Sequence, residues 1–176
     1  MSDATIHDRA GSQSGDEAGA ETPPILFLHG FPEFWAAWED VLPYFAKGWH
    51  AVAPDLRGFN LSSQPTDVAA YRARELIDDF ERFSERMGWS RLTVVAHDWG
   101  GAAAWQWAIA RPERVESLVI LNSPHPIPFA RDLERDPVQQ SASAYMNWLR
   151  APGAEGALMK HDCQALESFF LAMERP

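Results

Sequence analysis

Short apolar runs alternate with amphipathic stretches through residues 23–122. Four short runs rich in Val, Ile, Leu, Phe and Ala are typical of buried strands: residues 25–28, 50–53, 92–96 and 115–121. Helical spacing occurs between these runs, most clearly over residues 71–87, where Gly88 follows as a natural helix end. Residues 99–110 predict another helix, which Pro112 stops. The alternation predicts an α/β fold with a doubly wound, mostly parallel sheet.

The pattern changes on both sides of this segment. Residues 1–22 are polar and rich in Gly, Ser, Asp and Glu, so we expect a disordered tail. Residues 123–128 hold three prolines, which excludes regular strand pairing because proline lacks the N–H donor. Helical patterns follow over about 138–149 and 155–173. We therefore divide the chain into a tail (1–22), an α/β core (23–122) and the start of a helical lid (123–176).

Composition narrows the range of partners and compartments. The formal net charge of −10 argues against binding to nucleic acid or to an anionic membrane surface. No apolar run approaches the roughly 20 residues that span a bilayer, and the first 22 residues hold no apolar signal block. The single cysteine, Cys163, excludes an internal disulfide, so we expect a cytoplasmic protein. His and Cys do not cluster at ligand spacing, which predicts no metal.

The candidate chemistry lies at the end of the third run. Residues 96–100 read Ala-His-Asp-Trp-Gly, and they match the small-x-nucleophile-x-Gly turn of the α/β-hydrolase fold with Asp98 at its apex. A carboxylate there is suited to attack a saturated carbon and form an ester. The alternative is a structural Asp that caps the following helix. Residues 29–33 and 55–58 follow the other strands, at the sheet edge where ligands bind in such folds.

Three motifs in register resemble the epoxide hydrolase branch of the α/β-hydrolases, which is related to the haloalkane dehalogenases. They are His-Gly-Phe-Pro-Glu (29–33), Asp-Leu-Arg-Gly-Phe-Asn-Leu-Ser-Ser (55–63) and His-Asp-Trp-Gly-Gly (97–101). The likeness covers about residues 23–173 and includes the beginning of that family's helical cap. It implies a partial α/β-hydrolase sheet, no cofactor, and a small apolar substrate that reacts with water.

The resemblance implies roles for particular residues. Asp98 is the expected nucleophile, and the backbone N–H groups of Phe31 and Trp99 are the expected oxyanion hole. Tyr145 matches a cap tyrosine that donates a hydrogen bond to the epoxide oxygen. A phenol can do this because its pKa of about 10 keeps it protonated at neutral pH. The alternative is a half-buried tyrosine of a helix with a packing role.

Further residues receive pocket or structural roles. We expect the substrate pocket to be lined by His29, Pro32, Trp99 and Trp148. We also expect His29 to form hydrogen bonds that shape the loop of residues 29–33, which carries the Phe31 N–H. We expect Arg57 to brace its loop by an ion pair. Because His97 precedes the apex, its side chain is expected to point away from the site, while Tyr44 and Tyr71 are expected to pack structurally.

The resemblance leaves two rival functions open. The family's general base and its acid partner lie later than residue 176, so we expect a truncated enzyme whose second half-reaction is impaired. A haloalkane dehalogenase is the alternative within the fold, because Trp99 occurs at this position in both groups; halide release separates them. A third possibility is a non-catalytic remnant that binds a ligand or a partner. In that case an exposed sheet edge would favour self-association.

Overall fold

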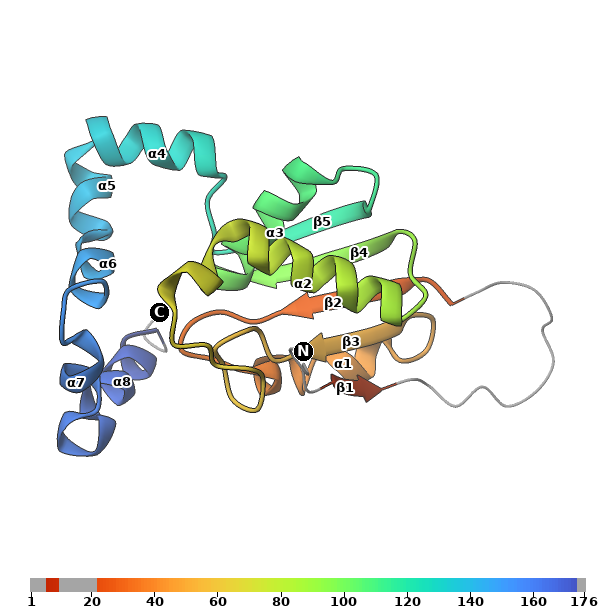
Figure 1. Cartoon of the computed structure of the whole chain (residues 1–176), viewed down its shortest axis with the longest axis horizontal. Helices are drawn as coiled ribbons and strands as arrows, with labels where there is room; N and C mark the ends of the chain where they lie inside the picture. The colour runs from red at the N-terminus through yellow and green to blue at the C-terminus, as the bar shows by residue number, and fades with distance from the viewer. Residues whose placement is uncertain (1–5, 10–21, 174–176) are drawn as a thin grey trace. The chain divides into compact units, whose positions relative to one another are not determined.

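The computed structural model describes residues 6–9 and 22–173, with the side chains of residues 22–168. Its sheet has five strands in the order β1-β3-β2-β4-β5 (Figure 1). Strands β2 to β5 are mutually parallel, whereas β1 runs antiparallel to β3. The bounds are β1 (Ile6–Arg9), β2 (Pro24–Leu28), β3 (His50–Pro54), β4 (Leu92–His97) and β5 (Val115–Leu121). The predicted doubly wound, mostly parallel sheet is confirmed.

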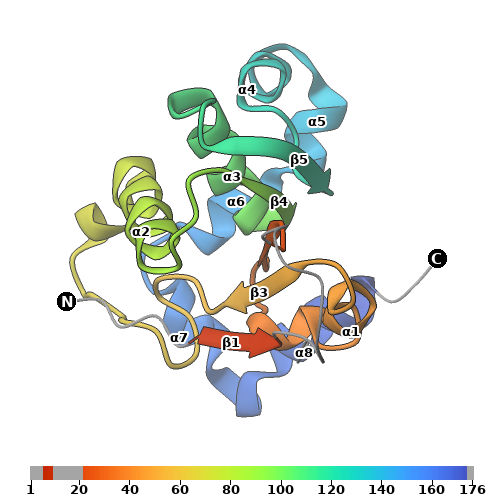
Figure 2. The ribbon, with the colours of Figure 1, turned by 90° about the vertical axis from the view of Figure 1, so that its right-hand side faces the viewer.

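Helices cover both faces of this sheet. Figure 2 shows α2 (Ala73–Arg86) and α3 (Asp98–Ala110) on one face and α1 (Leu42–Phe45) on the other. Two 3₁₀ turns, η1 (Trp35–Trp38) and η2 (Val68–Tyr71), lie in the connecting segments. The segment between β2 and β3 thus holds two short helical elements, η1 and α1.

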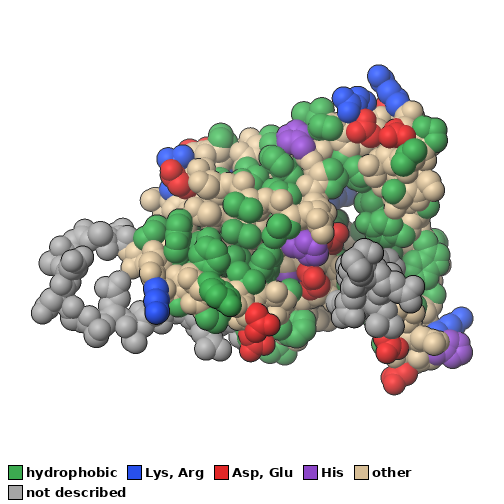
Figure 3. Space-filling model, turned by 180° about the vertical axis from the view of Figure 1, so that it is seen from behind, with side chains coloured by type: hydrophobic (Ala, Val, Ile, Leu, Met, Phe, Trp, Pro, Cys, Tyr) green, Lys and Arg blue, Asp and Glu red, His purple; other side chains and the backbone are tan. Residues whose placement is uncertain are grey.

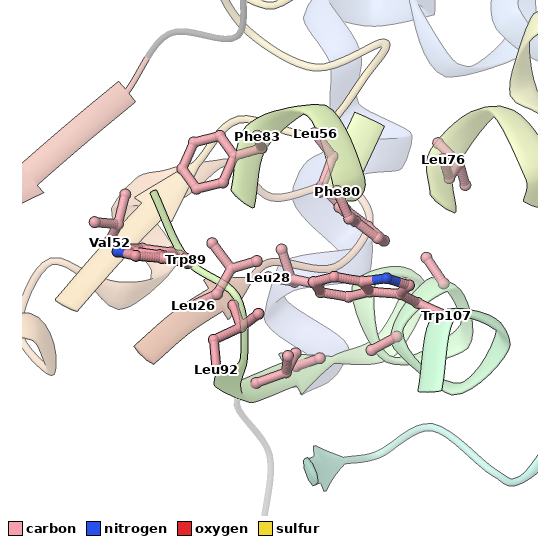
Figure 4. Packing of buried hydrophobic residues seen from close by; sticks show 14 residues of the cluster. Leu26, Leu28, Val52, Leu56, Leu76, Phe80, Phe83, Trp89, Leu92 and Trp107 are labelled. Atoms are coloured by element: carbon pink, nitrogen blue, oxygen red, sulfur yellow. The ribbon is translucent and has the colours of Figure 1, made fainter. Parts of the chain in front are cut away.

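The larger core lies between the sheet and the pair α2 and α3. Figure 4 shows the indole of Trp107 beside Phe80, with ring centroids 5.2 Å apart, among the aliphatic side chains of β2. Leu26 and Leu28 of β2 are fully buried here. Burying such a side chain contributes about 1.5–3 kcal/mol, so this layer fixes α3 firmly against the ends of the strands. The second core packs Phe27, Trp38 and Leu42 on the α1 face.

Strand β1 lies in the segment for which a disordered tail is expected. Ile6–Arg9 pair with β3 in the register Ile6↔Pro54 to Arg9↔Ala51. The expectation is wrong for these four residues, because strand pairing uses the backbone and needs no apolar signal in the sequence. Residues 1–5 and 10–21 of the expected tail lie outside the described residues.

Contacts between Cα atoms divide the chain into two units, Met1–Pro126 and Ile127–Pro176. The second unit is helical. Its elements are α4 (Pro126–Arg135), α5 (Pro137–Ala142), α6 (Ala144–Leu149), α7 (Ala154–Leu158) and α8 (Lys160–Met173).

Two features of this helical region differ from the sequence prediction. Helix α4 begins among the prolines of residues 123–128, where no helix is expected, because its own prolines occupy the first turn and cost no internal hydrogen bond there. The expected helix over 155–173 is interrupted near its start. Helix α7 ends at Leu158, and His161, Asp162 and Cys163 have left-handed backbone angles that place a kink inside α8.

The face of the first unit that carries α1 has exposed apolar side chains (Figure 3). Val119 and Leu121 of β5 are 47% and 43% exposed. Strand β5 ends the described sheet, with β4 as its one partner in the sheet order. Among the described residues, no helix is both long enough and apolar enough to cross a membrane.

Candidate active site

The turn between β4 and α3 places Asp98 at a sharp change of direction. His97 ends β4 in an extended conformation, and Asp98 begins α3 with a φ of +46°. This left-handed angle is uncommon for a residue with a side chain and carries strain of about 1–3 kcal/mol. Such strain is typical of turns at functional sites. The sharp turn presents one side chain, here that of Asp98, at the end of the sheet.

Two glycines allow α3 to begin close to the strand ends. A Cβ built on Gly100 would lie 2.5 Å from the carbonyl oxygen of His29 and 2.8 Å from that of Leu28. The Gly100 N–H donates to the same His29 carbonyl oxygen over 3.1 Å. A Cβ on Gly101 would lie 2.5 Å from the Cβ of Ser123. The Gly-Gly pair is therefore required for the close approach of α3 to the loops after β2 and β5.

The loop after β2 reaches the Asp98 carboxylate directly. The backbone N–H of Phe31 donates a hydrogen bond to Asp98 Oδ1 over 2.9 Å. The peptide bond between Phe31 and Pro32 is cis. A Cβ on Gly30 would lie 2.7 Å from Asp98 Cβ, so the loop passes close to the turn at Asp98. The structure thus brings together two of the predicted site groups, the Asp98 carboxylate and the Phe31 N–H.

A second carboxylate lies beside this contact. Glu33 Oε2 accepts a hydrogen bond from the Gly30 N–H at 2.8 Å and lies 3.0 Å from His97 Nδ1. The hydrogen bond to His97 lowers the pKa of Glu33, and the same bond raises the pKa of His97. No motif or spacing in the sequence relates Glu33 to His97. The side chain of His97 is directed toward Glu33, in the loop after β2.

His29 joins two loops from a fully buried position. Its Nε2 accepts a hydrogen bond from the Leu56 N–H over 3.0 Å, so Nδ1 carries the proton and donates to the Gly30 carbonyl oxygen over 2.9 Å. Burial lowers the pKa of His29 and keeps the ring neutral. The hydrogen bonding expected between His29 and this loop is present, at the Gly30 carbonyl oxygen. A pocket-lining role is wrong in this structure, because the side chain has no exposed surface.

The loop after β3 is held by two acidic residues. Arg57 forms a bidentate ion pair with Asp79 of α2, at 2.6 Å for each hydrogen bond, which confirms its predicted bracing role. Asp55 is buried and accepts hydrogen bonds from the Trp35 N–H and the Asn60 side chain. The sequence motif contains Asp55 and Asn60, but nothing in their spacing predicts these partners.

The remaining predicted pocket residues differ in exposure. Trp99, in the first turn of α3, is 41% exposed, and Pro32 is half-buried. Tyr145 and Trp148 lie on α6 in the second unit, 45% and 44% exposed. The roles of Tyr145, Trp148 and the Trp99 N–H remain predictions. Within residues 22–168, no three His, Cys, Asp or Glu side chains group closely enough to hold a metal ion.

The chain also matches a known protein family. A family model described as alpha/beta hydrolase fold matches residues 23–154. The chain belongs to the α/β hydrolase fold family. The expected fold class is thereby confirmed.

Curated members of the family resemble the chain over most of its length. The AB hydrolase superfamily protein YfhM of Bacillus subtilis (strain 168) is 37% identical over 162 residues, which cover 90% of this chain and 57% of YfhM. Epoxide hydrolase 4 of Mus musculus is 36% identical over 149 residues, covering 84% of this chain and 42% of the mouse protein. The chain thus spans about half the length of these relatives.

Solved structures of epoxide hydrolases also resemble the chain over nearly all of its length. A crystal structure of the Bacillus megaterium epoxide hydrolase in complex with an inhibitor superimposes with a TM-score of 0.87 and 32% identity, covering 97% of this chain and 57% of that one. An epoxide hydrolase from metagenomes of hot environments superimposes with a TM-score of 0.83 and 34% identity, covering 98% and 56%. The resemblance to epoxide hydrolases inferred from the motifs is confirmed.

Proposed function

We propose that this α/β hydrolase acts on epoxides, with Asp98 as the nucleophile that forms an ester with the substrate. The observation that carries the proposal is the hydrogen bond from the Phe31 N–H to Asp98 Oδ1, at a strained turn at the end of the sheet. The similarity to epoxide hydrolases supports this substrate class over other electrophiles.

The hydrogen bond distinguishes the two carboxylate oxygens. Oδ1 is held by Phe31, so Oδ2 is the oxygen that attacks a ring carbon. The new bond joins Oδ2 to that carbon while the ring C–O bond breaks and its electron pair remains on the epoxide oxygen. The resulting alkoxide takes a proton, for which the Tyr145 hydroxyl is the proposed donor. Oδ1 becomes the carbonyl oxygen of the ester.

The second step is hydrolysis of this ester to a diol. Water adds to the ester carbonyl carbon, and the negative charge develops on Oδ1. The Phe31 N–H already points at this oxygen, and the Trp99 N–H is the proposed second donor. Trp99 lies in the first turn of α3, where backbone N–H groups have no partner within the helix. The donors are therefore most useful in this step.

Hydrolysis also needs a base that activates the water. His29 is neutral and buried with both ring nitrogens hydrogen-bonded, so it is not proposed as that base. The hydrogen bond to Glu33 raises the pKa of His97 and favours its protonated form, which cannot accept a proton, so His97 is not proposed either. We therefore expect the ester to form faster than it is hydrolysed in the 176-residue polypeptide. The first half-reaction becomes visible as a stable adduct.

Intact mass spectrometry tests this proposal and separates it from haloalkane dehalogenation. An epoxide has no leaving group, so an aryl glycidyl ether adds its entire mass to the protein. A 1-bromoalkane of similar size would add its mass less that of hydrogen bromide and release bromide. We expect the epoxide adduct at one equivalent. Bromide release with no epoxide adduct would replace the proposal with dehalogenation, and no adduct from either reagent would refute both.

Self-association is a second role, favoured by the exposed side chains of β5. Val119 and Leu121 present apolar surface on an edge strand, which is a template for pairing with another chain. Val119→Lys would place a charge on that surface. Sedimentation velocity should show a concentration-dependent mass increase for the native chain that this variant reduces. A native chain that remains monomeric at all concentrations would exclude the role.

A further inference from the structure

The loop that carries the Phe31 N–H is fixed by one carboxylate oxygen. Glu33 Oε2 accepts from the Gly30 N–H at 2.8 Å, and the Glu33 N–H donates to the Gly30 carbonyl oxygen at 3.1 Å. The same Oε2 lies 3.0 Å from His97 Nδ1. His97 is the residue immediately before Asp98. The loop donor and the nucleophile are therefore tied together by a second connection besides their own hydrogen bond.

We propose that Glu33 and His97 form a positioning pair, which holds the Gly30–Phe31 backbone against Asp98 and makes the reactivity of Asp98 depend on the charge of His97. The inference rests on the proposed function for its reactivity readout. Neither side chain is assigned a contact with substrate, so the pair acts through the Phe31 N–H. Glu33 lies in the loop after β2 and His97 ends β4, so one contact between them couples the ends of two strands.

The surroundings of the pair favour this role over a surface ion pair. The side chains of His97 and Glu33 are 22% and 19% exposed, so solvent screens their attraction only partly. Asp98 faces His97 from the start of α3, and His29 faces Glu33 from the end of β2. Asp55, after β3, acts on His29. His29 is neutral because its burial lowers its pKa, which leaves His97 as the cation of this cluster.

The direction of the pH effect follows from this geometry. The hydrogen bond to Glu33 raises the pKa of His97 above its usual 6.5, and the same bond lowers the pKa of Glu33 below 4.5. Between these usual values both groups are charged and the loop is held most firmly. Above the raised pKa of His97 its proton is lost, the attraction weakens, and the Phe31 N–H is held less well. Misplaced groups slow reactions steeply, so we expect a decrease of about tenfold in adduct formation.

Two conservative variants separate charge from hydrogen bonding. In His97→Asn the side-chain amide can still donate to Glu33 but carries no charge at any pH. In Glu33→Gln the side-chain oxygen can still accept from the Gly30 N–H, but it no longer raises the pKa of His97. Glu39→Gln is the matched control, because Glu39 is exposed on the same segment. Near-UV circular dichroism establishes that each variant is folded.

Two readouts are measured from pH 5 to pH 9. The first is the rate of adduct formation with the aryl glycidyl ether. The second is the position of the Phe31 amide resonance in spectra of protein labelled with ¹⁵N-phenylalanine, which needs no substrate. In the native chain and in Glu39→Gln, both should change at one pKa above 6.5. The change should disappear in His97→Asn and move to lower pH in Glu33→Gln.

The outcomes distinguish this inference from the proposed function. If the native chain forms no adduct, the proposed function fails, and the Phe31 resonance still tests the pair. A Phe31 resonance that does not change with pH in the native chain overturns the inference. The inference is also overturned if the rate of adduct formation falls at alkaline pH in the native chain and falls equally in His97→Asn. Another group would then cause the decrease.

Discussion

Replacing Gly100 by alanine tests the close contact on which the site geometry depends. The new Cβ would lie 2.5 Å from the His29 carbonyl oxygen and 2.8 Å from that of Leu28. Ordinary carbon–oxygen contacts are at least about 3.4 Å, in line with the optimum for nonbonded atoms. Both obstacles are backbone atoms at the end of β2, so a side-chain rotation cannot remove the clash. Either α3 or the loop after β2 must move.

The expected loss of stability combines three effects. Overpacking a close-packed site costs about 1–3 kcal/mol, and the rigid obstacles favour the upper end of that range. Moving α3 away also weakens the hydrogen bond from the Gly100 N–H to His29, at about 1 kcal/mol. Replacing glycine by alanine inside a helix gains about 1 kcal/mol, which offsets that loss. The net decrease in the free energy of unfolding is therefore about 3 kcal/mol.

Urea unfolding followed by tryptophan fluorescence measures this decrease. With an m-value of about 2 kcal/mol/M, the midpoint should fall by about 1.5 M. Gly156→Ala is the matched control, because a Cβ on Gly156 meets no atom within 4 Å and the residue lies inside α7. It should gain up to about 1 kcal/mol. A Gly100→Ala variant as stable as the native chain would refute the close approach of α3 to β2.

Three further perturbations test other contacts of the site and its surroundings. Asp79→Asn leaves the guanidinium of Arg57 without its ionic partner and should lower the free energy of unfolding by about 2 kcal/mol in urea titrations. The pair of Glu33 and His97 should stabilise the fold fully from about pH 4.5 to pH 6.5, the usual pKa values of the two groups. Stability should fall as the pH rises through the raised pKa of His97, and also as it drops through the lowered pKa of Glu33. Tyr145→Phe removes the proposed proton donor and should slow adduct formation about 100-fold without changing stability by more than about 1 kcal/mol.

Each of these expectations has a contrary outcome. An Asp79→Asn variant with unchanged unfolding would show that the ion pair does not brace the loop. If the stability of His97→Asn depends on pH in the same way as that of the native chain, then groups other than His97 and Glu33 cause the dependence. A Tyr145→Phe variant that reacts at the native rate would leave the packing role for Tyr145. An Asp78→Asn variant, at an exposed position of the same helix, controls for the loss of a negative charge in the first case.

The sequence predicts the parallel strands well, because their apolar runs directly reflect burial. The run 25–28 corresponds to β2, whose last four residues are all buried. It does not predict β1, because Ile-His-Asp-Arg in Ile6–Arg9 carries no hydrophobic pattern and the strand forms through backbone pairing. Helix α4 is missed for another local reason. Its prolines exclude strands but are compatible with a first helical turn.

The candidate site is predictable where a motif requires a backbone shape. The spacing of small residues around Asp98 predicts the strained turn, and the structure has a positive φ there. The contact between Glu33 and His97 joins residues 64 positions apart, and no periodicity or spacing in the sequence relates them. The burial of His29 is missed for a similar reason. Its position depends on how the loops after β2 and β3 meet, with Leu56 as the partner.

The most direct test of the central claim is the position of the epoxide adduct. After reaction with the aryl glycidyl ether, the protein is digested and the modified peptide is sequenced by tandem mass spectrometry, with Asp98→Asn and Asp40→Asn treated in parallel. Asp40 is an exposed carboxylate in the segment between β2 and β3, and its variant serves as the control. We predict that the adduct lies on Asp98 in the native chain and in Asp40→Asn, and is absent from Asp98→Asn. An adduct on another residue, or equal labelling of Asp98→Asn, would contradict the assignment of Asp98 as the nucleophile.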